Sequence, residues 1–451
     1  MVSGSDDEEP GSLTLGGAVS LGTGVMIGAG IFALTGQVAE LAGDLFPVAL
    51  VAAALVVAAS AYSYVKLSNS MPSSGGIAMF LKEEYGLGLA TGVFSVFMYV
   101  SMVINESLVA RTFGSYVLQV VDLGSATFWV PALGVVLLAV AFVVNLSGNA
   151  IVQVAEGSMA AVKVAGLAVL AVGGLWFAEW ANLTNGSDGP DGVSPTITGF
   201  LAATALAILA YKGFTTITNS GGEIVDPHRN VGRAIVIALA ICSLLYLILA
   251  IAVAANLRVP EIIAAQDYAL AEAARPAFGD AGVWITVGVA IIATASGVIA
   301  SIFAASRMLA MLTKMDEVPH RHLGLPGTVR THTTIYTVAL AMLLTVFFDL
   351  KRIAALGAIF YLIMDIAIHW GLLRRLQNRI EFRAGIVVLA IVLDVVVLGA
   401  FLWIKASSDA LILVVAAVGI GAIVGGELWL MRSHTDDEGN MHMGGDLEHG
   451  T

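Results

Sequence analysis

Long apolar runs separated by short polar segments make up most of this 451-residue sequence. Each run holds about 20 residues, enough for a helix to cross about 30 Å of hydrocarbon. The pattern predicts an all-α polytopic membrane protein with twelve spans. These lie near residues 14–40, 44–68, 86–118, 126–146, 151–177, 197–222, 232–256, 281–312, 333–349, 353–373, 383–404 and 409–431.

The composition agrees with this pattern. Hydrophobic residues make up 58% of the chain and charged residues 12%, with a mean hydropathy of +0.90. A soluble chain of this length needs far more charge to cover its surface. The first run is flanked by the acidic segment "SDDEEP" and is followed at once by a second run, so it is not expected to be a cleaved signal peptide.

The basic residues between the spans predict the orientation. Lys and Arg are more frequent in the loops on the side of the N-terminus, so both termini are expected in the cytoplasm of a multi-pass protein of the cytoplasmic membrane. The net charge is −12, and much of it lies in the two tails. Acidic residues in the tails and in the outer loops favour an origin in a high-salt organism, where net charge maintains solubility. The alternative is that acidic tails are simply disordered, solvated segments.

We expect four parts along the chain. Residues 1–12 form an acidic cytoplasmic tail, 13–376 a transporter core of ten helices, 377–432 two further helices, and 433–451 a second acidic tail.

Glycine interrupts two of the spans. The first contains "GTGVMIGAGIFALTG", with five glycines in fifteen positions, and the sixth contains "AYKGFTTITNSGGEIVDPHRNVGRA". Glycines at the spacing of Gly24 and Gly28 also serve close helix packing, which is the simpler interpretation of one such segment alone. Two interrupted spans in corresponding positions instead indicate a transporter built from an inverted repeat of five helices plus five.

An interrupted helix exposes backbone groups that hydrocarbon cannot satisfy, so the breaks must face a cavity or a ligand. Free N–H groups around residues 29–31, at the start of a half-helix, suit a carboxylate. Carbonyls around residues 211–213 suit an ammonium group. Together the two breaks fit both ends of an α-amino acid.

Three segments carry a resemblance to a known family. "GTGVMIGAGIFALTG", "GGEIVDPHRNVGRAI" and "SIFAASRMLAMLTKMDEVP" resemble the signature segments of the amino acid–polyamine–organocation (APC) superfamily, and "PSSGGIAMFLKEEYG" resembles its loop after the second span. The resemblance implies an amino acid permease with a LeuT-like core of ten helices. Its motif places substrate binding at Ile27, Gly28, Ala29, Gly30 and Ile31 and at Tyr211, Gly213, Phe214 and Thr215.

Lys163 is the most informative charge within the spans, where a charge is a functional hypothesis by default. In sodium-independent APC members a similar lysine occupies the place of a sodium ion, and here Ser296 or Ser301 would accept from its ammonium. The alternative is a structural ion pair with Glu156, seven residues earlier. Both interpretations disfavour a sodium-dependent mechanism.

Further ionisable residues are candidates for proton transfer or gating. Glu106 either takes part in proton transfer or substrate binding or pairs with Arg111. Asp365 and His369, four residues apart, share a helix face and form a relay or a structural pair.

Lys212 either faces the site, where it would disfavour cationic substrates, or turns toward a carboxylate such as Glu106. Family members often carry an acid where this chain has Thr215, which weakens the case for an arginine or polyamine substrate. Glu223 is expected to pair with Arg233 or Arg307, as an inner gate or as a loop contact. Asp394 and Glu427 are interpreted as structural or as part of a subunit contact.

Motifs for other functions are missing from the sequence. It shows no phosphate-binding loop, metal-ligand cluster or nucleophile motif, so we expect neither an enzyme nor a cofactor or metal, and basic residues lie only where topology demands them, which excludes nucleic acid as a partner. The lone Cys242 rules out an internal disulfide.

The sequence thus favours a secondary carrier of amino acids in the lipid bilayer, working by alternating access, sodium-independent, and either proton-coupled or exchanging. A polyamine or organocation carrier is one alternative. A sensor that keeps the fold, with a further domain beyond residue 451, is another. The protein is expected to be a monomer or a homodimer.

Overall fold

The regular elements of the chain are helices, seen in a computed structural model that describes residues 13–73, 75–147, 149–180, 196–315 and 328–445. The side chains of residues 29, 149–156, 330 and 432–445 are outside this description. In chain order the elements are α1 (Leu15–Ala29), α2 (Ile31–Ala42), η1 (Gly43–Leu45), α3 (Phe46–Ser70), α4 (Gly76–Tyr85), α5 (Leu89–Val117), α6 (Ala126–Leu146), α7 (Asn149–Trp176), α9 (Ile197–Ile208), η2 (Leu209–Tyr211), α10 (Phe214–Asn219), η3 (Gly221–Glu223), α11 (Pro227–Asn256), α12 (Val259–Ala264), α13 (Ala269–Lys314), α14 (Val329–Phe347), α15 (Leu350–Arg375), α16 (Ala384–Ser408) and α17 (Ala410–Gly445).

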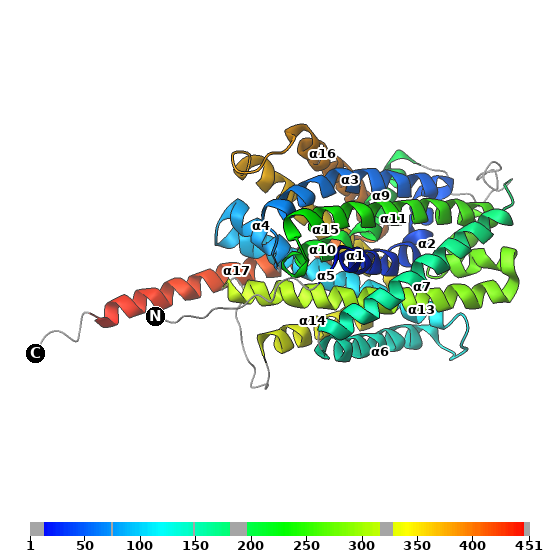
Figure 1. Ribbon diagram of the computed structural model, residues 1–451, viewed down its shortest axis with the longest axis horizontal. Coiled ribbons are helices and arrows are strands. Elements are labelled where there is room, and N and C mark those ends of the chain that lie inside the picture. The colour runs from blue at the N-terminus through cyan, green and yellow to red at the C-terminus, as the bar shows by residue number, and fades with distance from the viewer. Residues whose placement is uncertain (1–12, 74, 148, 181–195, 316–327, 446–451) are drawn as a thin grey trace, which may run out of the picture.

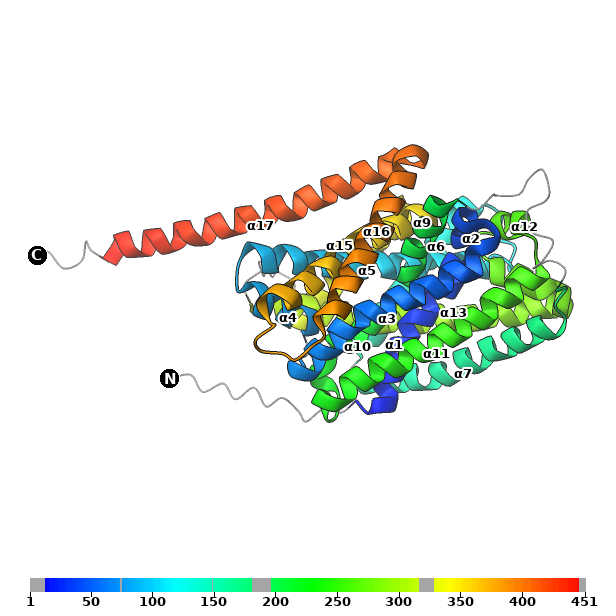
Figure 2. The same cartoon turned by 90° about the horizontal axis from the view of Figure 1, so that it is seen from above.

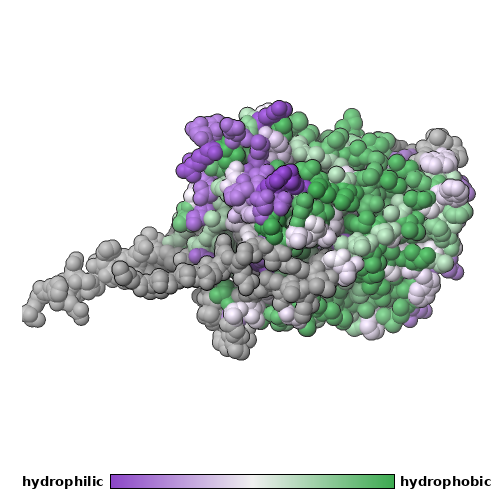
Figure 3. All heavy atoms as spheres, in the orientation of Figure 1, coloured by the Kyte–Doolittle hydropathy of each residue, from purple (hydrophilic) through white to green (hydrophobic). Residues whose placement is uncertain are grey.

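The long helices form one bundle with α1 near its centre (Figure 1). Among the described residues, ten helical segments are long and apolar enough to cross a membrane, and two shorter apolar helices cover Leu15–Gly28 and Thr331–Phe347. The space-filling view shows a broad hydrophobic surface along the bundle and hydrophilic residues at the end where α4 lies (Figure 3). The prediction of an all-helical polytopic membrane protein is confirmed.

Local sequence sets several helix starts. The hydroxyl oxygens of Thr14, Thr196 and Thr328 accept from the backbone N–H three residues later, and the carboxylate of Asp349 does the same. These side chains satisfy N–H groups that have no partner within the helix. The caps therefore fix where α1, α9, α14 and α15 begin.

Two helical segments extend beyond the predicted spans. α13 runs from Ala269, well before the predicted start at residue 281. It bends at Gly279, whose positive φ of 61° glycine adopts without the steric cost that a Cβ atom would bring. α17 continues to Gly445, past the predicted end of the last span and into the predicted tail, and projects from the bundle (Figure 2). Hydrophobicity marks only the part of a helix that meets lipid, so the sequence pattern missed these polar ends.

The first and sixth predicted spans are both interrupted, as expected. α1 ends and α2 begins at Gly30, whose φ and ψ are −75° and −90°. The sixth span consists of α9, the 3₁₀ turn η2 and the short α10, with Lys212 and Gly213 between the last two. α1 packs against α11, α13 and η2, which places the two breaks side by side in the bundle.

Glycines also allow the close packing around α1. A Cβ atom on Gly28 would lie 3.0 Å from Gly297 Cα on α13, and one on Gly213 would lie 2.8 Å from the Gly22 carbonyl oxygen on α1. Gly28 is therefore a packing residue against α13, whereas Gly30 forms the break. The two interpretations of the glycine-rich segment apply to different residues within it.

Candidate functional site

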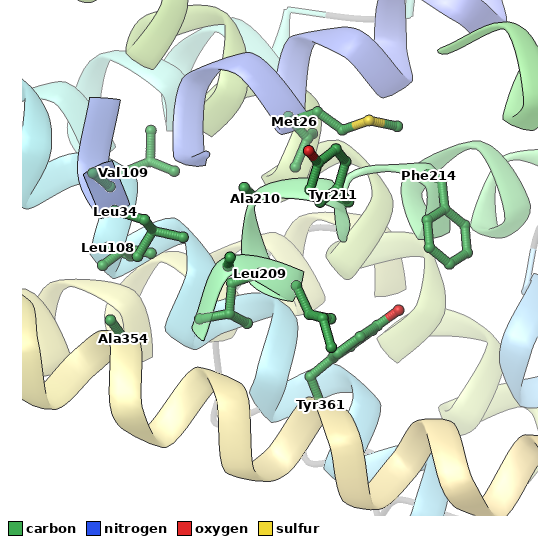
Figure 4. Packing of buried hydrophobic residues seen from close by; sticks show 14 of the residues in the cluster. Met26, Leu34, Leu108, Val109, Leu209, Ala210, Tyr211, Phe214, Ala354 and Tyr361 are labelled. Atoms are coloured by element: carbon green, nitrogen blue, oxygen red, sulfur yellow. The ribbon is translucent and has the colours of Figure 1, made fainter. Parts of the chain in front are cut away.

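Apolar side chains surround the two breaks (Figure 4). Met26 comes from α1, Leu34 from α2, Val109 from α5, and Ala210 and Tyr211 from η2, and all five are buried. Ile27 and Ile31, on either side of the first break, are buried as well. The breaks thus lie in a low-dielectric interior, where exposed backbone groups attract a polar ligand strongly.

The backbone at the first break is partly satisfied. The Gly30 N–H donates to the Met26 carbonyl at 2.7 Å, and the Gly30 carbonyl accepts from the Leu34 N–H at 3.1 Å. The first N–H groups of α2, beginning at Ile31, have no acceptor within that helix. Of the residues predicted to present N–H groups, Gly30 thus has its own partner, and Ile31 opens the half-helix.

At the second break the carbonyls already accept within tight turns. The Lys212 carbonyl accepts from the Thr215 N–H at 3.0 Å and from the Thr215 hydroxyl at 2.9 Å, and the Gly213 carbonyl accepts from the Thr216 N–H at 3.1 Å. A carbonyl oxygen has two lone pairs, so the Gly213 carbonyl retains capacity for a ligand.

Aromatic residues cover the second break. Tyr211 donates to the Leu50 carbonyl at 3.2 Å and lies against Tyr246, with ring centroids 5.1 Å apart. Tyr246 donates to the Ala210 carbonyl at 3.2 Å. Phe214 meets the ring of Tyr64 edge to face at 5.0 Å. Sequence reasoning missed Tyr246, which belongs to an apolar stretch of α11 without any motif.

Lys163 reaches α13 from α7. Its Nζ donates to Ser296 Oγ at 2.7 Å, and the lysine side chain is fully buried. Ser301, the other predicted acceptor, instead donates to Glu106 Oε1 at 3.2 Å. The alternative partner, Glu156, has a side chain outside the described residues.

Two buried ionisable side chains meet at α5: Glu106, which belongs to that helix, and Lys212, which reaches it from the second break. Glu106 is fully buried, and its Oε2 has no hydrogen-bond partner among the described residues. Lys212 turns to α5 as well, where its Nζ donates to the Ser101 carbonyl at 2.6 Å and contacts the Ser101 hydroxyl. A buried carboxylate and a buried ammonium thus both lie against α5.

The ion pair between Glu106 and Arg111, one of the two interpretations of Glu106 from the sequence, is not present among the described residues. Arg111 donates to the Thr345 carbonyl on α14 at 2.7 Å. Residues five positions apart on a helix point in directions about 140° apart, so the two side chains leave α5 on different sides.

Glu223 pairs with Arg307, in the C-terminal half of α13, rather than with Arg233. Both side chains are largely buried, and the Arg307 guanidinium stacks on the Phe303 ring at 3.3 Å from its centroid. The Leu13 N–H donates to the Glu223 carbonyl at 2.8 Å. The start of α1, η3 and α13 are therefore tied together at one point.

Asp365 lies in a polar cluster between α3, α15 and α16. It accepts from the Ser60 hydroxyl and the Tyr64 hydroxyl, each at 2.6 Å, and its predicted neighbour His369 lies 3.6 Å away. The cluster also contains Asp394 of α16, which the sequence analysis had set aside as structural or as a subunit contact.

Comparisons with known proteins agree with this architecture. The profile described as amino acid permease matches residues 13–424. This chain belongs to the amino acid permease family. The permease is 30% identical over 400 residues to the Escherichia coli inner membrane transport protein YbaT, covering 87% of this chain and 91% of that protein.

More distant relatives extend this picture. The permease is 27% identical to the vacuolar cationic amino acid transporter 4 of Arabidopsis thaliana, over 73% of this chain and 57% of that one. It is also 27% identical to the large neutral amino acids transporter small subunit 2 of Mus musculus, over 62% of this chain and 53% of that one. The predicted resemblance to APC permeases is confirmed, and these proteins are membrane transporters rather than enzymes.

Proposed function

We propose that this permease is a secondary transporter that moves an amino acid across the cytoplasmic membrane by alternating access. The names of the Arabidopsis and mouse relatives support an amino acid as the substrate class. The paired breaks at Gly30 and at residues 212–213 are the observation that carries the proposal. In transporters with inverted repeats, such breaks hold the substrate near the middle of the membrane.

The proposed architecture is a LeuT-like repeat of five helices plus five, followed by α16 and α17. α1 with α2 and α9 with α10 are the interrupted helices that open the two repeats. The count of twelve spans takes α1 and α2 as one, separates α3 from α2, and includes the shorter α14. Both termini are proposed to lie in the cytoplasm.

The substrate carboxylate is proposed to accept from the first N–H groups of α2, beginning at Ile31. The half-helix adds a favourable partial charge there. The ammonium group is proposed to donate to the Gly213 carbonyl, with Tyr211, Phe214 and Thr215 beside the side chain. Ile27 and Gly28 are proposed to shape the wall of the site through the packing of α1 against α13; Ala29, whose side chain is outside the described residues, contributes its backbone.

Sodium independence is proposed from Lys163. Its ammonium lies between α7 and α13 and bonds Ser296, so it supplies a fixed positive charge beside the first interrupted helix. A sodium ion would need oxygen ligands and a net negative site, which a buried ammonium opposes. Glu106, Lys212 and Asp365 are the candidates for carrying a coupled proton, and the Glu223–Arg307 pair is proposed as an inner gate.

The test is uptake into proteoliposomes of a panel of labelled amino acids, in sodium-free buffer, with and without an inward proton gradient. Saturable uptake raised by the gradient supports a proton-coupled carrier. Uptake that needs amino acid inside the vesicles supports an exchanger. A requirement for sodium would contradict the proposal.

A polyamine or organocation carrier is the second candidate, and one observation favours it. The Glu106 Oε2 atom has no partner among the described side chains and could accept from a cationic substrate. Lys212 bonded to Ser101 on the same helix opposes this, because a buried ammonium repels a second cation. Uptake of spermidine without uptake of any amino acid in the panel would establish this candidate. If a folded protein took up neither spermidine nor any amino acid, a sensor would be favoured.

A further inference from the structure

Three buried side chains meet where α15 and α16 pack against α3. Asp365 and His369 come from α15 and Asp394 from α16, and each is at most 1% exposed. Asp365 and His369 are four positions apart, so both lie on one face of α15. One donor atom from each of the three residues lies within 4.8 Å of the other two.

The spacing of these atoms is too long for hydrogen bonds. His369 Nε2 lies 3.6 Å from Asp365 Oδ2 and 3.5 Å from Asp394 Oδ2. A hydrogen bond between an imidazolium and a carboxylate would bring such atoms to about 2.7 to 2.9 Å. Neither nitrogen of His369 and neither oxygen of Asp394 has a hydrogen-bond partner among the described residues.

The same spacing suits three ligands around one metal ion. Nitrogen and oxygen ligands lie about 2.0 to 2.2 Å from tetrahedral zinc, which places them about 3.3 to 3.6 Å from one another. Both measured distances from His369 Nε2 lie in this range. The His369 Nε2 atom thus lies at the distance from each carboxylate oxygen that two ligands of one ion keep, and all three ligand atoms lie within 4.8 Å of one another.

Charge and outer contacts support the same assignment. Two carboxylates in the interior of a membrane bundle need compensation, and no lysine or arginine of the described residues forms an ion pair with either of them. A divalent cation with a neutral imidazole balances both. The hydroxyls of Ser60 and Tyr64 bind Asp365 at 2.6 Å, as outer groups that orient a ligating carboxylate do.

We propose that Asp365, His369 and Asp394 bind one divalent transition-metal ion of the zinc class. The ion would join α16, which lies outside the ten-helix core, to α15 and, through the hydroxyls on Asp365, to α3. The three ligands belong to neither interrupted helix, so the proposal does not depend on the proposed substrate, although Tyr64 links Asp365 to Phe214 beside the second break. A bound ion would exclude Asp365 as a proton carrier. No metal-ligand cluster was expected from the sequence, because Asp394 lies 25 positions after His369 and no motif joins the two.

Zinc content and thermal unfolding test the proposal. The purified protein is stripped with a chelator, incubated with Zn²⁺, desalted, and assayed for bound zinc and for its unfolding midpoint. We expect His369→Gln and Asp394→Asn each to bind one zinc fewer than the wild type, and zinc to raise the midpoint of the wild type by a few degrees but not that of the variants. Asp394→His, which keeps a zinc ligand, should retain the ion.

Controls separate this site from the histidines elsewhere in the chain. His228, whose Nδ1 contacts the Asn69 carbonyl at the exposed start of α11, is the matched control, and His228→Gln should bind as much zinc as the wild type. X-ray absorption of the wild-type zinc complex is independent of whether the variants fold and should show one imidazole with oxygen ligands. Equal zinc in all variants, or a shell of several imidazoles, would overturn the proposal, as would a wild type that binds no zinc.

Discussion

Lys163 Nζ lies 2.7 Å from Ser296 Oγ, although the two residues are 133 positions apart in the chain. The bond joins α7 to α13, the helix that packs against α1 beside its break. Because the lysine is fully buried, its ammonium acts in a low-dielectric interior where a fixed charge has its largest effect.

Lys163→Ala should abolish most transport. The alanine variant removes the hydrogen bond to Ser296 and the positive charge between α7 and α13. We therefore expect the initial uptake rate to fall about tenfold or more, equivalent to roughly 1.4 kcal/mol. Ser296→Ala, which keeps the charge, should have a smaller effect. Lys66→Ala, a lysine beside the Tyr62 ring near the end of α3, is the control and should transport normally.

Initial uptake in proteoliposomes, with and without sodium, measures this difference. Wild-type rates in Lys163→Ala, or a loss in Ser296→Ala as large as that in Lys163→Ala, would contradict the role of the charge.

The Glu223–Arg307 pair should show coupling in a double-mutant cycle. Glu223→Gln and Arg307→Gln each remove one member of a largely buried ion pair, so each should lower the uptake rate. The exchange of the two charges in Glu223→Arg with Arg307→Glu should recover part of the loss, with a coupling of about 0.5 to 3 kcal/mol. If the double variant shows the simple sum of the two losses, the pair is not a functional contact.

Gly30→Ala should damage the break in α1. An added Cβ would collide with the Tyr246 hydroxyl and would lie 2.9 Å from the Ala210 side chain, so the two interrupted helices could not keep their contact. We expect a lower thermal midpoint and lost substrate binding. Gly288→Ala on α13 is the control: its Cβ would meet no atom within 4 Å, and alanine favours a helix interior by about 0.5 to 1 kcal/mol.

Glu84→Gln should change how stability depends on pH. Glu84 lies on α4, outside the membrane spans, with both carboxylate oxygens buried and without a partner among the described residues, and burial raises the pKa of its carboxyl well above the usual range. The folded protein then binds more protons than the unfolded chain between the unfolded and the folded pKa. Stability from this group is full below the unfolded pKa and falls as pH rises toward the folded pKa.

The thermal midpoint of the detergent-solubilised protein from pH 5 to pH 8 measures this effect. Glu84→Gln should have the higher midpoint at pH 8 and a flatter profile than the wild type. Glu83→Gln is the matched control, because the neighbouring Glu83 is exposed and pairs with Arg379 at the surface. Parallel profiles for all three proteins would show that Glu84 is not buried as a neutral acid.

The partners of the buried charges show where sequence reasoning stops. Lys163 was expected to bond Ser296 or Ser301, and the structure brings it to Ser296 while Ser301 turns to Glu106. Both serines lie on α13, and their spacing alone does not say which one lies opposite α7. Asp394 was left without a partner for the same reason, because α16 and α15 are separate helices whose relative rotation no local pattern records.

The sequence by itself determined the apolar spans, the interruptions at Gly30 and Gly213, and the family. These depend on composition and on single residues: a span needs about 20 apolar positions, and a break needs a glycine at membrane depth. Only the tertiary structure decided that Tyr246 covers the second break, that Glu223 pairs with Arg307, and that Asp365, His369 and Asp394 meet. Helical periodicity fixes which face a residue occupies, but the neighbour on that face is set by how whole helices pack, through many weak contacts between distant parts of the chain.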